Sequence, residues 1–179
     1  MALLNHRRLV ARGNFNNGKK VGVWQFYDAA GRLNEKFNYD KQSFTYEAPI
    51  DQTDDFNFVF DDSVKVADRL TRPLKIGGVF YGFIPYLSIF KLPFDTYDVR
   101  MDDFKAYLEL LISPMGQLAN YRVRVYSAQY HYDHIFNMDV HLFSEEDRTF
   151  LPATKNGEGV ISRIVIKCYV TPYGTLDFY

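Results

Sequence analysis

Hydrophobic and polar residues alternate along several stretches of the chain, most regularly from Val160 to Val170. A period of two residues is typical of a β-strand with one buried face. The buried face of this strand would carry Ile164, Ile166, Cys168 and Val170. The opposite face would carry Arg163, Val165, Lys167 and Tyr169. Phe104–Ser113 and Leu118–Tyr126 alternate in the same way around a turn at 114–117, which predicts an antiparallel strand pair.

The amino-terminal part, from Leu9 to Tyr39, reads as three strands joined by two turns. Asn16-Asn17-Gly18 predicts a tight hairpin, because Asn and Gly tolerate the positive φ of primed turns. Val21–Tyr27 would be the central strand, with Trp24 and Phe26 on one face and Tyr27 on the other. Leu33–Tyr39 would return beside it.

Two segments favour helix. Val79–Phe90 is apolar enough for a short helix, although Gly82 and Pro85 weaken it. Ile135–Glu146 carries Ile135, Met138 and Leu142 at helical spacing, which predicts a second helix. Asn156-Gly157 predicts another hairpin turn before the last strand. The second half therefore reads helix, strand, strand, helix, strand.

The expected organisation is a β-hairpin repeat region over residues 1–48, a connector over 49–71 and a larger domain over 72–179. Ser43–Ala48 and Phe56–Phe60 are expected to be short strands near or within the connector. The predicted fold class is α+β, with an antiparallel sheet of three to four strands and two helices on one face, preceded by the β-hairpin repeat unit.

The segment from Gly13 to Leu33 resembles the MORN-like repeat of the YwqK antitoxin-like family, and the repeat region extends to about residue 39. The matching positions are Gly13, Gly18, Gly22, Gly31, Trp24, Phe26, Tyr27, Asp28 and Leu33. A single unit of this kind cannot bury its own hydrophobic face, so it must stack on further repeats or on the rest of the chain. The resemblance implies a binding surface on the repeat at Trp24, Phe26 and Tyr27.

Residues 72–171 resemble the carboxy-terminal domain of TonB-family proteins. The resemblance is carried by the Arg72–Gly78 motif, Leu92-Pro93, the turn at Met115-Gly116, and Phe150–Gly157 followed by the Ile161–Val170 strand. It implies that this last strand lies at a sheet edge and pairs with an extended partner peptide. Arg163, Val165, Lys167 and Tyr169 would then flank the partner. The alternatives are an edge protected by its own charges, or one covered by the tail Tyr173–Tyr179.

Composition narrows the function classes. A net charge of −1 removes the driving force for generic nucleic-acid binding. No apolar run approaches the roughly 20 residues of a membrane span. The 17% aromatic content favours a β-rich protein. The single cysteine, Cys168, excludes a disulfide within the chain and alternates with core residues, so we expect it to be buried.

His131, His134 and His141 are the weak candidates for a metal site, because imidazoles are competent zinc ligands. Their spacing lacks the paired histidines and intervening glutamate of zinc proteases. Solvated or capping histidines are the preferred interpretation, and we expect no metal, no other cofactor and no catalytic machinery.

Together, the two resemblances imply a non-catalytic protein-interaction or scaffolding protein of the bacterial cell envelope, periplasmic, whose targeting segment is absent from this chain. It would bind a protein or peptide partner by β-strand addition, and a homodimer stays open. One alternative is an antitoxin-like cytoplasmic module that binds its partner through the repeat. The other is a metal-dependent enzyme that uses the three histidines.

Overall fold

The structure is a computed structural model that describes residues 2–4, 8–28, 30–49, 55–61, 63–94 and 99–178. Residues 50–54 and 62 of the predicted connector lie outside these ranges. The chain divides into two compact units. The first comprises Met1–Asp51 and Lys75–Ile84, and the second comprises Gln52–Leu74 and Pro85–Tyr179. Each unit is described by itself.

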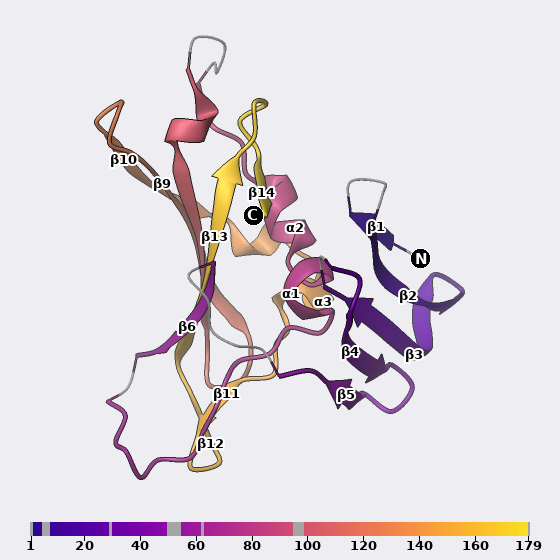
Figure 1. The fold of residues 1–179 in the computed structure, drawn as a ribbon. Coiled ribbons are helices and arrows are strands. Elements are labelled where there is room, and N and C mark those ends of the chain that lie inside the picture. The colour runs from indigo at the N-terminus through magenta and orange to yellow at the C-terminus, as the bar shows by residue number, and fades with distance from the viewer. Residues whose placement is uncertain are drawn as a thin grey trace. The chain divides into compact units, whose positions relative to one another are not determined.

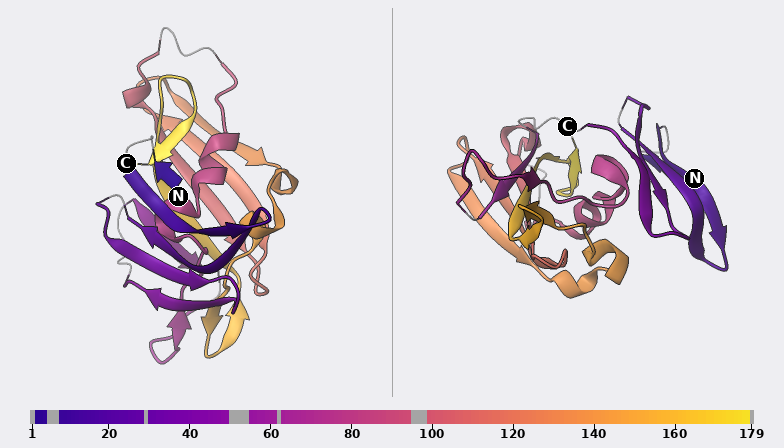
Figure 2. Two further views of the ribbon diagram at one scale, coloured as in Figure 1. Left: turned by 90° about the vertical axis from the view of Figure 1, so that its right-hand side faces the viewer. Right: turned by 90° about the horizontal axis from the view of Figure 1, so that it is seen from below.

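The first unit is a five-stranded antiparallel sheet in the order β1-β2-β3-β4-β5, seen as the indigo and purple strands of Figure 2. Asn17 and Gly18 adopt the positive φ values, 48° and 76°, that the hairpin motif predicts. Two strands flank the three predicted ones: β1, which was not expected, and β5, which matches the short strand expected over Ser43–Ala48. The strands are β1 Ala2–Leu4, β2 Arg8–Asn16, β3 Lys19–Tyr27, β4 Leu33–Asn38 and β5 Ser43–Glu47.

A short helix, α1 Gly78–Tyr81, covers the apolar face of this sheet within the same unit. Trp24, Phe26 and Phe37 form a buried cluster, against which Ile76 and Tyr81 pack. Burying this face removes the large aromatic surface from water, which is the main favourable term available to so small a sheet. The apolar face of this sheet is therefore buried by a later segment of its own chain.

The second unit is built on a six-stranded antiparallel sheet in the order β10-β9-β8-β13-β14, with β6 also paired to β13 (Figure 1). The α+β class with antiparallel sheets is confirmed, and the sheet has six strands rather than three or four. Its strands are β6 Phe56–Phe60, β8 Lys105–Ile112, β9 Leu118–Ser127, β10 Tyr132–Met138, β13 Ser162–Val170 and β14 Leu176–Phe178.

The alternation predicted for β8, β9 and β13 sorts their side chains onto two faces. On the inner face, Leu108, Leu110, Val123, Ile164 and Ile166 are all buried. Helix α2, Ile84–Ile89, lies against this face: its Tyr86 packs edge-on against Tyr121, whose hydroxyl donates to the Tyr86 carbonyl at 2.6 Å. The segment predicted as one short helix over Val79–Phe90 is helical but forms two short helices, α1 and α2, with a break at Gly82 and Phe83.

The second unit also contains a small three-stranded sheet and several short helical turns. Asn156 and Gly157 have φ values of 56° and 90°, as the hairpin prediction requires, and join β11 to β12. These strands form a three-stranded sheet with β7. The elements are β7 Leu70–Thr71, β11 Ala153–Lys155, β12 Glu158–Val160, the 3-10 helices η1 Met101–Asp103 and η2 Val140–Leu142, and helix α3 Glu145–Arg148.

The helix predicted over Ile135–Glu146 is wrong. Tyr132–Met138 is strand β10, and only single turns of helix, η2 and α3, follow it. A turn at 128–131, where His131 has a φ of 50°, reverses the chain after β9. All seven β10 residues then pair with β9, so cross-strand backbone hydrogen bonds hold the segment along one side. Tertiary pairing overrides the helical spacing of its apolar residues.

Candidate functional site

The predicted binding strand β13 is an interior strand, so the prediction that it forms an open edge is wrong. On one side it pairs with β8 from Ser162 to Tyr169. On the other side it pairs with β6 from Ser162 to Ile166 and with β14 from Cys168 to Val170. The Lys167 N–H, which lies between these two partners, donates to the Asp55 carbonyl at 2.8 Å. No backbone side of β13 is left for an added strand.

The four residues predicted to flank a partner lie together on the outer face of the sheet, where they are half-buried. Arg163 and Lys167 form ion pairs with Asp61 and Asp55, at 3.3 and 3.1 Å. The Tyr169 hydroxyl donates to Asp177 Oδ2 at 3.1 Å, and Val165 lies between Arg163 and Lys167 along the strand. The polar side chains of β13 therefore contact residues in or next to the neighbouring strands, and they do not line an open groove.

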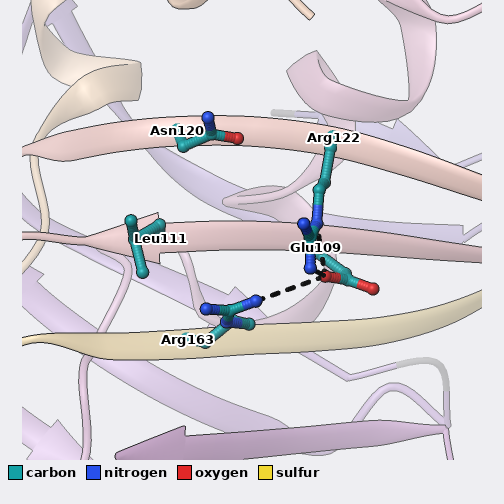
Figure 3. Close-up of a pocket in the computed structure, with 5 residues that line it drawn as sticks. All are labelled: Glu109, Leu111, Asn120, Arg122 and Arg163. Carbon is teal, nitrogen blue, oxygen red and sulfur yellow. Dashed lines mark hydrogen bonds and ion pairs between the residues drawn. The ribbon is translucent and has the colours of Figure 1, made fainter. Parts of the chain in front are cut away.

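A pocket of about 130 Å³ opens on the same outer face. Figure 3 shows Arg122 and Arg163 approaching Glu109 from the strands on either side. The Arg122 Nε donates to Glu109 Oε2 at 2.7 Å, and the Arg163 Nη1 lies 3.7 Å from the same oxygen. Leu111 and Asn120 complete the lining. Because both guanidinium groups already face carboxylates, the pocket is a cross-strand ion network and not a free anion site.

The prediction of a binding surface at Trp24, Phe26 and Tyr27 is wrong for the first two residues, because both are buried. Trp24 and Phe26 are 1% and 0% exposed and form the core of the first unit, so neither ring is part of the exposed binding surface that the sequence-based prediction requires. Tyr27 lies on the opposite face of β3 and donates its hydroxyl to Gln25 Oε1 at 2.8 Å. Aromatic side chains on one face of a strand are more often core than binding surface, and this face follows that rule.

The three histidines belong to three different elements. His131 belongs to the β9–β10 turn, His134 to strand β10 and His141 to η2. Among the described residues, no group of three or more His, Cys, Asp and Glu side chains could hold a metal ion. The structure therefore supplies no donor set for the weak metal candidate.

Strand β10 is the open edge that distinguishes the second unit. In the described ranges, the outermost strands of the three sheets are β1, β5, β6, β7, β10, β12 and β14. β10 is the longest, with seven residues, and its register with β9 contains no shift. It contains neither proline nor lysine, the residues that often protect a sheet edge from association. Figure 1 shows β10 with β9 as its one neighbour.

The two faces of β10 differ in chemistry. Asp133, Ile135 and Asn137 are paired with Tyr126, Arg124 and Arg122, and so lie on the outer face. The exposed side chain of Ile135 sits midway along the strand. Asp133 accepts two hydrogen bonds from Arg124, at 2.9 and 2.6 Å. These hydrogen bonds and the adjacent positive charge lower the pKa of Asp133.

Aromatic packing holds β10 from its inner face. Phe136 packs edge-on against Phe90, with ring centroids 5.2 Å apart. Tyr132 packs against Phe94 and Phe104 in the same way, at 5.6 and 5.8 Å. The exposed His134 lies between Tyr132 and Phe136, its ring 4.5 Å from that of Phe136. The strand is thus supported from its inner face, while no described strand pairs with its outer backbone edge.

The sequence-based interpretation missed β10 because Ile135, Met138 and Leu142 also fit a helical period. A competing signal is present in the same segment: Tyr132, His134, Phe136 and Met138 alternate with Asp133, Ile135 and Asn137. A strand of this kind directly after the predicted strand Leu118–Tyr126 is typical of a hairpin. The segment fits both the helical period and the two-residue period of a strand, and the sequence alone does not show which structure forms.

Comparison with protein-family models, with curated proteins and with solved structures finds no match to this chain. Within the residues that the structure describes, no helix has the length and apolar character needed to cross a membrane.

Proposed function

We propose that this protein is a non-catalytic binding module that pairs with an extended segment of another polypeptide along the outer edge of β10. The observation that carries the proposal is a long, regular edge strand that lacks a neighbour on its outer side in the described part of the chain. An added strand would satisfy its unpaired N–H and C=O groups, each hydrogen bond contributing about 1 kcal/mol net.

The side chains of β10 supply the selectivity that backbone pairing lacks. Ile135, 44% exposed, offers an apolar contact on the outer face. On the inner face, His134 and Phe136 offer an aromatic contact. Residues directly opposite or diagonal in a sheet interact with each other. We therefore infer a partner segment with an apolar residue opposite Ile135 and an aromatic or β-branched residue on the inner face.

The bacterial cell envelope is the location that we propose for this binding, with a scaffolding role. The support is the resemblance of residues 72–171 to TonB carboxy-terminal domains, in which an extended partner segment joins the sheet. The proposed pairing differs from the implied one in its position, since β10 takes the place of β13.

The test first selects, from a library of displayed random peptides long enough to span β10, those that bind the intact protein. Hydrogen exchange of the protein's backbone amides, with and without a selected peptide, then locates the binding site. We expect selected peptides to slow exchange at outward-facing amides of Tyr132–Met138. Ile135→Lys should reduce affinity at least tenfold, because a charge on an edge strand opposes association. Leu142→Lys is the matched control, since Leu142 is 63% exposed but lies in η2.

Two results would overturn the proposal. Peptides that bind equally to the Ile135→Lys variant, or that leave the exchange of β10 amides unchanged, would place binding elsewhere. A concentration-dependent dimer that Ile135→Lys abolishes, seen by sedimentation, would assign the edge to a second copy of the chain instead of a different partner.

A further inference from the structure

The side-chain ammonium of Lys20 is surrounded by three aromatic rings in the first unit. Its Nζ lies 5.4 Å from the ring centroid of Trp24, 5.3 Å from that of Tyr39 and 5.1 Å from that of Tyr81. All three distances fall within the range of a cation–π interaction, about 6 Å. The three residues come from β3, the turn after β4, and α1. We call Trp24, Tyr39 and Tyr81 the aromatic cage.

The Trp24 wall is fixed by β2. The indole Nε1–H of Trp24 donates to the Asn14 carbonyl at 3.1 Å. Gly13 lies under the indole ring, in a place where a Cβ atom would overlap it. The ring is thus held both by a directed hydrogen bond and by the shape of the neighbouring strand.

The Tyr39 wall is fixed by Gly22. The Tyr39 N–H donates to the Gly22 carbonyl at 2.9 Å, and the Gly22 N–H donates to Asp40 Oδ1 at 3.0 Å. These two hydrogen bonds pin the turn after β4 onto β3. They set the position from which the Tyr39 ring reaches Lys20.

The Tyr81 wall is fixed by a buried carboxylate. Glu35, 3% exposed, accepts hydrogen bonds from the N–H groups of Gly77 and Gly78, at 2.9 and 3.1 Å. Both glycines have positive φ, which aims their N–H groups at one anion. This anchors the start of α1 to β4 and places Tyr81 over the sheet. The three walls are therefore held independently of Lys20.

We propose that the aromatic cage is a binding site for a trimethylammonium group, which enters when Lys20 leaves. A trimethylammonium cation is weakly hydrated and carries no N–H, so aromatic faces can replace its water without leaving a donor unsatisfied. A lysine ammonium is strongly hydrated and loses more by entering. Lys20 reaches the cage through a flexible four-carbon stem and can swing back to water. It acts as a resident competitor inside the same site.

Competition by Lys20 has a measurable consequence. The apparent affinity for a ligand falls by the fraction of molecules whose site is open. If Lys20 fills the cage about nine-tenths of the time, Lys20→Ala should tighten binding about tenfold. Trp24 is the single tryptophan of the chain, so intrinsic fluorescence reports directly on the cage.

The experiment titrates the full chain with choline and follows Trp24 fluorescence. The neutral control is 3,3-dimethylbutan-1-ol, in which carbon replaces the charged nitrogen of choline. We expect a saturable response to choline, at least fivefold weaker for the alcohol, and tighter binding by Lys20→Ala. Lys19→Ala is the matched control, because Lys19 is the exposed neighbour of Lys20 on β3. Tyr81→Leu removes one wall and should abolish the response while the thermal unfolding transition is retained.

Further titrations distinguish the sources of this group. A trimethyllysine peptide tests a modified protein, and phosphatidylcholine vesicles against phosphatidylglycerol vesicles test a lipid headgroup. The proposal is supported if any one of these ligands changes Trp24 fluorescence and binds more tightly to the Lys20→Ala variant. The ligand that does so identifies the source of the trimethylammonium group. A Lys20→Ala variant that folds but gives no saturable response to choline, peptide or vesicles overturns it. An equal response to choline and to the neutral alcohol does so as well.

Discussion

The pyrrole half of the Trp24 indole lies directly over Gly13, in the space that a Cβ atom on Gly13 would fill. This contact joins β2 to β3 at the core of the first unit, where Trp24 is 1% exposed. A glycine in a strand interior usually weakens the strand, and here it permits a close approach that no other residue allows.

Gly13→Ala should therefore displace the indole and lower the free energy of unfolding by about 1–3 kcal/mol, the range for overpacking a well-filled core. Urea denaturation followed by Trp24 fluorescence measures both effects. Gly18→Ala is the control: its φ is +76° and its surroundings are open. It should cost about 1 kcal/mol through backbone strain and leave the Trp24 emission unchanged. Identical emission and stability in Gly13→Ala and the wild type would contradict the packing described.

Glu35 carries the second prediction. Its buried carboxylate accepts from two backbone N–H groups, and Glu35→Ala would leave both donors without this acceptor. Hydrogen bonds to a charged acceptor contribute about 1.5–3 kcal/mol each. We expect Glu35→Ala to destabilise the first unit by about 3 kcal/mol and to speed hydrogen exchange at Gly77 and Gly78. The exposed Glu158, replaced by Gln, should change neither quantity. Slow exchange at both glycines in Glu35→Ala would refute this role.

The Arg124–Asp133 pair predicts a pH dependence at the β10 edge. The Arg124 hydrogen bonds lower the pKa of Asp133 in the folded chain. The contribution of this carboxylate to stability is therefore present above the ordinary pKa of an aspartate and is lost as the pH falls through the lowered value. Arg124→Gln should raise the pKa of Asp133 toward its ordinary range, measured by NMR titration of the side-chain carboxyl. Arg122→Gln, whose partner is Glu109, should leave that pKa unchanged.

Cys168 provides a fourth prediction. Burial raises the pKa of its thiol to about 12, so the reactive thiolate is scarce at neutral pH. We expect iodoacetamide at pH 8 to modify the folded protein at least a hundredfold more slowly than the urea-unfolded chain, followed by mass spectrometry. A raised folded pKa also means that this group's contribution to stability declines as the pH rises above the unfolded thiol value, about 8.5. Rapid modification of the native protein would show that β13 opens.

The tight turns and the faces of the regular strands were predictable because they depend on neighbouring residues. Asn17-Gly18 and Asn156-Gly157 adopt positive φ, a conformation that Asn and Gly favour locally. The alternation in β8, β9 and β13 assigns each side chain to a face once the segment is extended, and the buried set matches it. The interpretation of Ile135–Glu146 as a helix failed where two periods overlapped. Pairing with β9 decided between them.

The amino-acid sequence by itself determined the hairpin turns, the side chains on the buried face of the long strands and the α+β class. Each of these follows from local backbone preference and from the burial of apolar residues. Only the tertiary structure decided which strand stands at the edge. β6 pairs with β13 across about a hundred residues of chain, and no local pattern at Arg163–Tyr169 records that pairing. The aromatic cage is non-local in the same way, because Tyr81 reaches Lys20 through a helix that Glu35 anchors. Strand order and cage depend on which distant segments bury each other's surface, and that is a property of the whole fold.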